Sequence, residues 1–160
     1  MSNALINKKI VSVSARQTQR LASQMAKNIL ANELRAGAFV LALEGDLGSG
    51  KTTFTQGLAK GLGVKGRITS PTFVVMKRFK NFYHFDCYRL NEPEEILQLG
   101  WQEIIANPAN IVVVEWPEKI KKFLPKERLN LKFKFLNQTQ RQIAGLYPNS
   151  LTTATNSVRI

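Results

Sequence analysis

The segment LEGDLGSGKTTF, at residues 43–54, combines three glycines, one lysine and two threonines directly after a run of apolar residues. Gly45, Gly50, Lys51 and Thr52 match the spacing G-x-x-x-x-G-K-[ST], which is typical of a phosphate-binding loop between a strand and a helix. Glycine reaches positive φ without steric cost and lets backbone N–H groups come close to an anion. A loop of this composition is therefore suited to hold the phosphates of a nucleotide.

Each residue type has its own role in this interpretation. The N–H groups of the loop and of the first helical turn face the phosphates, where the helix N-terminus adds partial positive charge. Lys51 is expected to reach the β- and γ-phosphates as a point charge, and the Thr52 hydroxyl to be a ligand for Mg²⁺. The residues expected to bind the nucleotide in this loop are Gly45, Leu47, Gly48, Ser49, Gly50, Lys51, Thr52 and Thr53.

Transfer of a phosphoryl group also requires a metal, and the metal usually needs a carboxylate at the end of a neighbouring strand. The sequence offers two candidates, since Glu115 ends the apolar run IVVVE and Asp86 ends FYHFD. Either acid could instead pair with a surface lysine. A charged acid at the end of a buried strand costs free energy unless it has a functional partner. This cost favours Glu115 as the metal ligand beside Thr52. Asp86 stays open as the alternative.

A hydroxyl-rich segment, TSPTF at residues 69–73, lies between the loop and these acids. Thr69, Ser70 and Thr72 supply hydroxyls, and Pro71 stiffens the segment. Its position matches the switch I region of P-loop proteins, in which hydroxyls sense the γ-phosphate and the metal. A simple turn is the alternative interpretation.

Three further residues close to the acids have less specific patterns. Trp116 follows Glu115 directly and is either part of the core or a reporter of a moving loop. His84, the only histidine, is expected to be a packed surface residue of an alternating strand rather than a catalytic base. Cys87, the only cysteine, is expected to be buried, and it has no partner for an internal disulfide.

Hydrophobic periodicity and turn residues predict the elements that position these groups. Strands are expected at residues 8–14, 38–45, 73–79, 82–88, 111–115, 128–136 and 141–147. Helices are expected at residues 15–34, 51–63, 94–100, with Asn91 as the cap and Pro93 in the first turn, and 101–108. Strands that alternate with helices, with hairpins in the middle and at the end, predict an α/β fold. The expected architecture is a P-loop NTPase-like three-layer sandwich with a mixed, largely parallel central sheet and β-hairpin additions.

Length and composition favour one domain without a membrane span. A chain of 160 residues suits a single core, expected at residues 1–147, followed by a polar and loosely ordered tail at 148–160. No apolar run reaches the length of a spanning helix, and a cytoplasmic protein is expected.

The net charge is +12, and residues 47–85 hold seven Lys or Arg but no acid. This charge either attracts a phosphate-bearing or acidic partner or only reflects solubility.

Four motifs together resemble the bacterial TsaE (YjeE) family: GDLGSGKTTFTQGLAKGLG, TSPTF, YHFDCYRL and VVVEWPEK, in this order and at these spacings. The resemblance covers about residues 10–145. It implies Mg²⁺-dependent binding of ATP and ADP and hydrolysis of ATP, in the threonylcarbamoylation of adenosine 37 in tRNAs that read ANN codons. Hydrolysis would be weak alone and stronger with two partners, the transferase TsaD and its scaffold TsaB, through which tRNA could also be reached.

The resemblance also implies roles for particular residues. It places Glu115 at Mg²⁺ or its water shell, Asp86 and Thr72 in the same catalytic region, and Trp116 in a second switch-like segment. The region around Ser14 and the hairpin near Arg141 are expected to approach the adenine. The family often has Glu-Thr where this chain has Gln17 and Thr18, which removes a charge at that position. It often has Leu at the position of Cys87.

Three other functions remain open from the residues alone. A small-molecule or nucleotide kinase would need an arginine-rich lid, and no arginine-dense insertion separates the loop from Glu115. A GTPase would need the guanine-reading pattern N-K-x-D, which the sequence lacks. A basic RNA-binding module would bind phosphates with strong salt dependence. The sequence also offers no clearly placed arginine to neutralise the γ-phosphate in cis, which predicts slow basal turnover.

Overall fold

The computed structural model describes residues 5–31, 35–69 and 74–148. Its elements follow one another along the chain as β1 (Leu5–Ser12), α1 (Ala15–Ala31), β2 (Phe39–Glu44), α2 (Lys51–Gly61), β3 (Met76–Phe79), β4 (Phe82–Asp86), the 3₁₀ helix η1 (Pro93–Leu99), α3 (Trp101–Ala106), β5 (Ile111–Glu115), the 3₁₀ helix η2 (Pro117–Phe123), β6 (Leu129–Phe135) and β7 (Arg141–Pro148). Among these elements, no helix is both long enough and apolar enough to cross a membrane.

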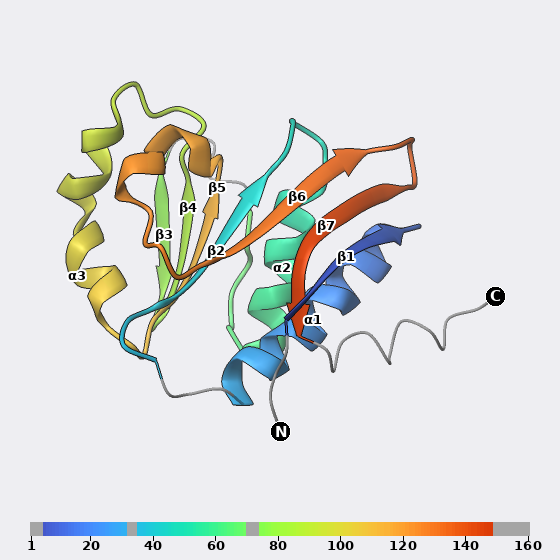
Figure 1. Cartoon of the computed structure of the whole chain (residues 1–160), viewed down its shortest axis with the longest axis horizontal. Coiled ribbons are helices and arrows are strands. Elements are labelled where there is room, and N and C mark those ends of the chain that lie inside the picture. Colours follow the sequence, from blue (N-terminus) through green and yellow to red (C-terminus); the bar gives the residue numbers. More distant parts are fainter. Residues whose placement is uncertain (1–4, 32–34, 70–73, 149–160) are drawn as a thin grey trace.

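The strands form a single sheet in the order β1-β7-β6-β2-β5-β4-β3 (Figure 1). The four central strands, β6, β2, β5 and β4, are parallel to one another, and antiparallel pairs add β3 at one edge and β7 and β1 at the other. The mixed sheet with hairpin additions at both edges confirms the expected fold class. The carboxyl ends of the parallel strands meet at one edge of the sheet, where α/β proteins bind their ligands.

Helices cover both faces of the sheet and create two separate hydrophobic clusters. Side chains alternate along each strand, so Val113 of β5 packs under α1 and α2 while Val112 and Val114 pack under η1, α3 and η2. Phe54 and Met25 are fully buried on the first face, and Trp101 is fully buried on the second. The result is the expected three-layer sandwich.

The two helical layers differ in how much of the sheet they cover. The cluster under η1, α3 and η2 contains residues of β2, β3, β4 and β5 but no described residue of β1, β6 or β7. These three strands form the end of the sheet that lies away from α3 in Figure 1. Along β6 every second residue is consequently exposed until the strand ends at two exposed residues. Within residues 5–31, 35–69 and 74–148, no helix therefore covers this face of that half of the sheet.

The structure differs from the expected elements at several places, including β1, which begins at Leu5 instead of residue 8. The cap of the first short helix is Glu92 rather than Asn91, because the Glu95 side chain accepts the backbone N–H of Glu92 and completes a reciprocal capping box. That helix is a 3₁₀ helix, and a second one, η2, follows Pro117 where no helix was predicted. Strand β3 begins at Met76 instead of residue 73, and Phe73 lies outside the described residues.

Candidate nucleotide-binding site

The glycine-rich loop leaves the carboxyl end of β2 and enters α2 at Lys51. Gly45 has φ +151°, and a Cβ there would lie 2.6 Å from the carbonyl oxygen of Phe133, so both the backbone angle and the space require glycine. Gly50, which precedes α2, has φ +102° and provides no side-chain cap for the helix. The first N–H groups of α2 thus keep their hydrogen-bonding capacity for a ligand.

The loop forms one wall of a pocket of about 780 Å³. All the loop residues expected to bind phosphates line it except Gly45, whose backbone angle sets the course of the loop. The other walls come from the start of α1, the ends of β4 and β5 and the turn between β6 and β7. These walls include Ser14, Thr18, Asp86, Tyr88, Arg89, Glu115, Trp116, Thr139 and Arg141. The sheet thus brings segments from near both ends of the described chain to the loop.

Lys51 is a buried cation held by the loop itself. Its Nζ donates to the carbonyl oxygens of Gly45 and Asp46, the latter at 2.9 Å, and lies 4.3 Å from the centre of the Trp116 ring. Burial lowers the pKa of Lys51 below its usual value, while the negative charges of Glu115 and, after it, Asp86 partly oppose this shift. A phosphate would offer the ammonium a charged acceptor in place of neutral carbonyls, and such bonds are stronger.

Thr52 and Glu115 meet at the base of the pocket. The Thr52 hydroxyl lies 3.2 and 3.3 Å from the two carboxylate oxygens of Glu115, whose side chain is almost fully buried. Magnesium holds oxygen ligands at about 2.0–2.1 Å in an octahedron, which separates neighbouring ligands by about 3 Å. The two side chains therefore fit a shared Mg²⁺, and among the described residues no cluster of three or more His, Cys, Asp or Glu could hold a metal by itself. Phosphate oxygens and water would have to complete the shell.

His84 is the third side chain of this group, which also contains Glu115 and Thr52. Its Nε2 lies 2.8 Å from Glu115 Oε1, and its side chain is completely buried on β4 beside β5. The expectation of a surface histidine is therefore wrong. β4 is an inner strand covered on both faces, so an alternating pattern does not bring any of its central residues to solvent. Sequence reasoning missed this contact, although a polar residue two positions before Asp86 in a fully apolar strand was a usable signal.

Asp86 lies beside Glu115 in the register of β4 and β5, so both candidate carboxylates stand at one edge of the sheet. Its Oδ1 accepts the backbone N–H of Tyr88 at 3.1 Å, which closes the turn after β4. Asp86 lines the pocket, and the carboxylate oxygens of Glu115 are the ones that lie within 3.3 Å of the Thr52 hydroxyl. The geometry thus favours Glu115 for the metal and leaves Asp86 at the pocket wall. Arg89, which sequence reasoning missed, follows this turn and also lines the pocket.

Ser14 and Arg141 reach the pocket from opposite ends of the chain. The Ser14 hydroxyl accepts the N–H of Gln17, and the Gln17 side chain accepts the N–H of Val13 at 2.7 Å, so the two residues cap α1. Glutamine performs this capping without a charge. Arg141 donates from Nε to the carbonyl oxygen of Gly48 at 3.0 Å and thereby ties β7 to the phosphate loop.

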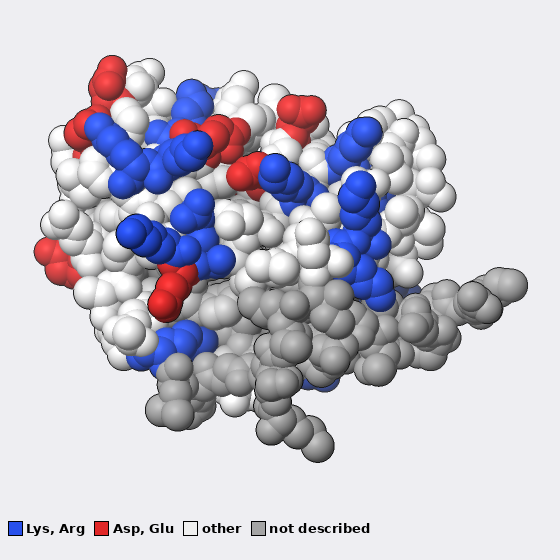
Figure 2. Space-filling model, in the orientation of Figure 1, with Lys and Arg blue, Asp and Glu red and all other residues white. Residues whose placement is uncertain are grey.

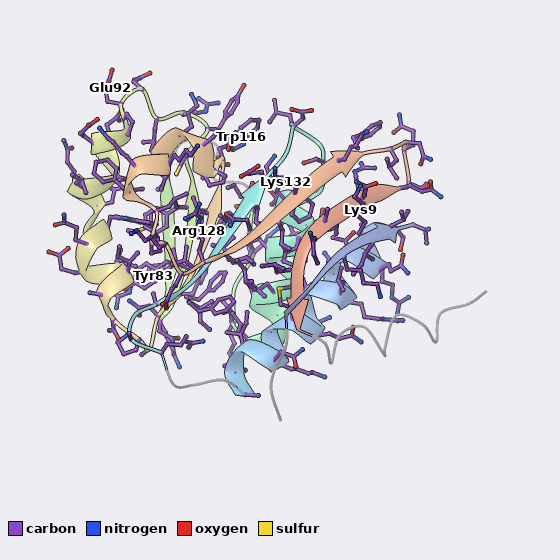
Figure 3. The ribbon with its side chains drawn as sticks, in the orientation of Figure 1. Lys9, Tyr83, Glu92, Trp116, Arg128 and Lys132 are labelled. Atoms are coloured by element: carbon purple, nitrogen blue, oxygen red, sulfur yellow. The ribbon has the colours of Figure 1, made fainter. Side chains whose placement is uncertain are left out.

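Of the expected switch-like residues, Thr69 and Trp116 are described, and Ser70, Pro71 and Thr72 lie outside the described residues. Thr69 accepts a hydrogen bond of 2.6 Å from Lys77. Trp116 has φ +58°, a left-handed backbone angle that is rare for an aromatic residue. Its ring packs against Tyr88, with ring centres 4.9 Å apart, and also lines the pocket (Figure 3). Trp116 thus belongs both to the edge of the second cluster and to the site.

The three-layer α/β fold and the glycine-rich loop after β2 define a protein of the P-loop NTPase-like class. The family model described as "Threonylcarbamoyl adenosine biosynthesis protein TsaE" matches residues 12–143, and the chain belongs to this family. The match includes every described site residue named above.

Bacterial proteins named TsaE resemble the chain over most of its length. The protein named tRNA threonylcarbamoyladenosine biosynthesis protein TsaE from Rickettsia typhi is 35% identical over 133 residues, which are 80% of this chain and 87% of that protein. The one from Bacillus subtilis is 42% identical over 108 residues, 65% of this chain and 66% of that protein. The crystal structure of Bacillus subtilis YdiB superposes with a TM-score of 0.70 at 29% identity and covers 98% of both chains.

Proposed function

We propose that this protein binds ATP and ADP together with Mg²⁺ and hydrolyses ATP, slowly when alone, in the threonylcarbamoylation of adenosine 37 of tRNAs. In this proposal TsaD and TsaB are its partners, and it works in the cytoplasm, where tRNA is modified. The observation that carries the proposal is the contact between Thr52 and Glu115 beside Lys51, at the base of a pocket walled by the glycine-rich loop.

The side chains of the pocket would act on the nucleotide in distinct ways. Lys51 would exchange the carbonyl oxygens of Gly45 and Asp46 for phosphate oxygens and place its charge beside the terminal phosphates. Mg²⁺, when bound, supplies positive charge that neutralises the phosphates. Thr52 and Glu115 would hold that ion or its water, and His84 keeps the Glu115 carboxylate directed at Thr52. The N–H groups at the start of α2 would orient the phosphates.

Slow turnover would follow from the positions of two of the pocket cations, Arg141 and Lys51, while the third, Arg89, is exposed after the turn that ends β4. Arg141 is held by carbonyl oxygens of Gly48, Asn137 and Gln140, and Lys51 is a single ammonium. Fast P-loop hydrolysis usually relies on an arginine that reaches the γ-phosphate in the transition state and contributes about 10³–10⁵ in rate. A partner that supplies or reorients such a group would stimulate the reaction, which agrees with the proposed roles of TsaD and TsaB.

The decisive experiment compares ATP hydrolysis by the purified wild-type protein with and without TsaB and TsaD. Lys51→Ala should abolish nucleotide binding, and Glu115→Ala should retain much of the binding but lose turnover. Lys60→Ala, an exposed lysine on the same helix, is the matched control for Lys51→Ala. Equal hydrolysis by wild type, Lys51→Ala and Glu115→Ala would refute the site. Phosphate transfer from ATP to nucleosides or sugars would show a kinase instead.

A further inference from the structure

The half of the sheet made of β6, β7 and β1 has one face that no helix of the described residues covers, here called the open sheet face. It lies opposite α1 and α2, which pack against the other face of the same strands through Leu131, Phe133 and Ile143. The residues that alternate with these point to the open side. They include Lys132 and Lys134 on β6 and, through the strand register, Lys9 on β1.

The register places these lysines in a regular array. Lys132 and Lys9 both pair with Ala144 of β7, so the two lysines flank a small residue across three strands. Neighbouring strands are about 4.8 Å apart, which separates the two backbones by about 10 Å. Lys134 follows Lys132 by two positions, or about 7 Å along the strand. Arg128, just before β6, continues the same line in the other direction (Figure 3).

Acidic residues are almost absent from this half of the sheet. The segments LINKKIVS, LNLKFKF and RQIAGLYP of β1, β6 and β7 contain no Asp or Glu. The nearest described acid in the register is Glu44 on β2, 3.9 Å from Lys132, and both side chains are largely exposed. Glu44, Asp46 and Glu118 border a hollow together with Arg128 and Lys132. Among the described residues no acid forms an ion pair with Lys9 or Lys134, which carry the unbalanced positive charge. Figure 2 shows the resulting group of Lys and Arg side chains over this half of the molecule.

The residues between the lysines carry no charge, so the array suits an extended chain of negative charges. Ala144 and Gln142 are small or neutral, and Val11 and Leu146 are 47% and 39% exposed. Lysines on such a surface contact phosphates without reading bases, and the phosphate backbone supplies most of the affinity of non-specific nucleic-acid binding. The family's role in tRNA modification makes RNA the polyanion that the protein would meet. An acidic protein surface would also be attracted, and the exposed Val11 and Leu146 would add apolar contacts to it, so the test below separates the two partners.

We propose that the open sheet face binds the phosphate backbone of RNA through Lys9, Lys132 and Lys134. This inference goes beyond the nucleotide site and does not depend on ATP hydrolysis. The same strands also border the pocket, because β1 leads into Ser14 and β7 begins at Arg141. RNA bound to the open sheet face would therefore lie beside the bound nucleotide, because β1 and β7 border both binding sites.

The test measures binding of a fluorescently labelled, unmodified tRNA transcript to the full chain at several salt concentrations. The triple variant K9Q/K132Q/K134Q should weaken binding by about tenfold or more at 0.1 M salt and reduce the salt slope by about two to three charges. The control K27Q/K60Q/K65Q removes three exposed lysines on or beside α1 and α2, and its binding should stay within about threefold of wild type. Thermal unfolding and ATP affinity of both triples should match the wild type.

Several results would overturn the inference. The first is that the wild type does not bind the transcript at 0.1 M salt. The second is that both triple variants lose affinity equally, and the third is that K9Q/K132Q/K134Q keeps the wild-type affinity. Displacement of the transcript by polyglutamate at an equal concentration of charges would also overturn it, because the face would then be a site for acidic proteins. Failure of the wild type to bind ATP would refute the proposed function alone and leave the RNA measurements valid.

Discussion

His84 Nε2 lies 2.8 Å from Glu115 Oε1, and both side chains are excluded from solvent. The contact joins two neighbouring parallel strands, β4 and β5, directly beneath the phosphate loop. Because the same Glu115 carboxylate is also in reach of the Thr52 hydroxyl, the histidine fixes the direction of a carboxylate that would otherwise rotate freely. Histidine Nδ1 is buried and has no hydrogen-bond partner among the described residues, so Nε2 is the atom that connects His84 to the site.

Replacement of His84 should therefore impair the metal site more than nucleotide binding. We expect His84→Ala to lower Mg²⁺-dependent ATP hydrolysis by about 10–100-fold, the range found when a residue that orients a metal ligand is removed. Metal-free ADP affinity should change little. His84→Gln, which can still donate to Glu115, should restore part of the activity. Hydrolysis by folded His84→Ala at the wild-type rate would show that the contact is only structural, and circular dichroism would establish that the variant is folded.

Trp116 should report nucleotide binding by its fluorescence. Lys51 Nζ lies over the Trp116 ring, and a phosphate that attracts this ammonium would change the surroundings of the indole. The other tryptophan, Trp101, is fully buried against Phe85 and donates its indole N–H to Phe123. Titration with ADP and Mg²⁺ should change the emission of wild type and of Trp101→Phe but not of Trp116→Phe. A change that persists in Trp116→Phe would contradict the position assigned to this ring.

The close approach of α1 and α2 should make Gly57 intolerant of a side chain. A Cβ at Gly57 would lie 2.3 Å from the backbone oxygen of Gln19, and backbone cannot yield as a side chain can. Overpacking of this kind costs about 1–3 kcal/mol, so Gly57→Ala should lower the melting temperature by several degrees. Lys60→Ala on the exposed side of the same helix should change it little. An unchanged melting temperature for Gly57→Ala would mean that the two helices can separate freely.

Cys87 should be unreactive in the folded protein. Burial raises the pKa of the Cys87 thiol to about 12, and the negative charges of Asp86, Glu118 and Glu115 add to this effect. At pH 8.5 the thiol is then far below its pKa and almost entirely protonated, while only the thiolate is nucleophilic. Alkylation by iodoacetamide at that pH should be roughly a thousandfold slower in buffer than in guanidinium. Since the chain has one cysteine, mass spectrometry follows this site alone, and rapid alkylation of the native protein would refute the prediction.

Local patterns were sufficient for most of the fold. The apolar runs of β2 and β5 and the spacing around Lys51 predicted a strand, a loop and a helix in the right places, because each depends on residues close in sequence. The hairpin of β6 and β7 was predicted for the same reason. The pairing of β1 with β7, by contrast, depends on contacts between the two ends of the chain, and no local pattern contains it.

The site was predictable where a single motif defined it and not where separate strands meet. Lys51, Thr52 and Glu115 were identified from their own segments. The burial of His84 follows from the position of β4 inside the sheet, which the sequence does not reveal. The 3₁₀ helix after Trp116 escaped prediction because Pro117 suggested only the end of a strand, whereas proline is also favourable at the first position of a helix.

The pairing of β1 with β7 also has a consequence for biosynthesis. β1 is the first described strand to leave the ribosome, and its only partner in the sheet is the last one. β1, which leads into Ser14, therefore has no partner strand until β7 has been translated. A nascent chain stalled before Arg141 has its glycine-rich loop but lacks the wall that completes the pocket. Such a chain also lacks the contact between Arg141 and Gly48 that ties β7 to the glycine-rich loop, so the loop gains this support only after β7 has been made.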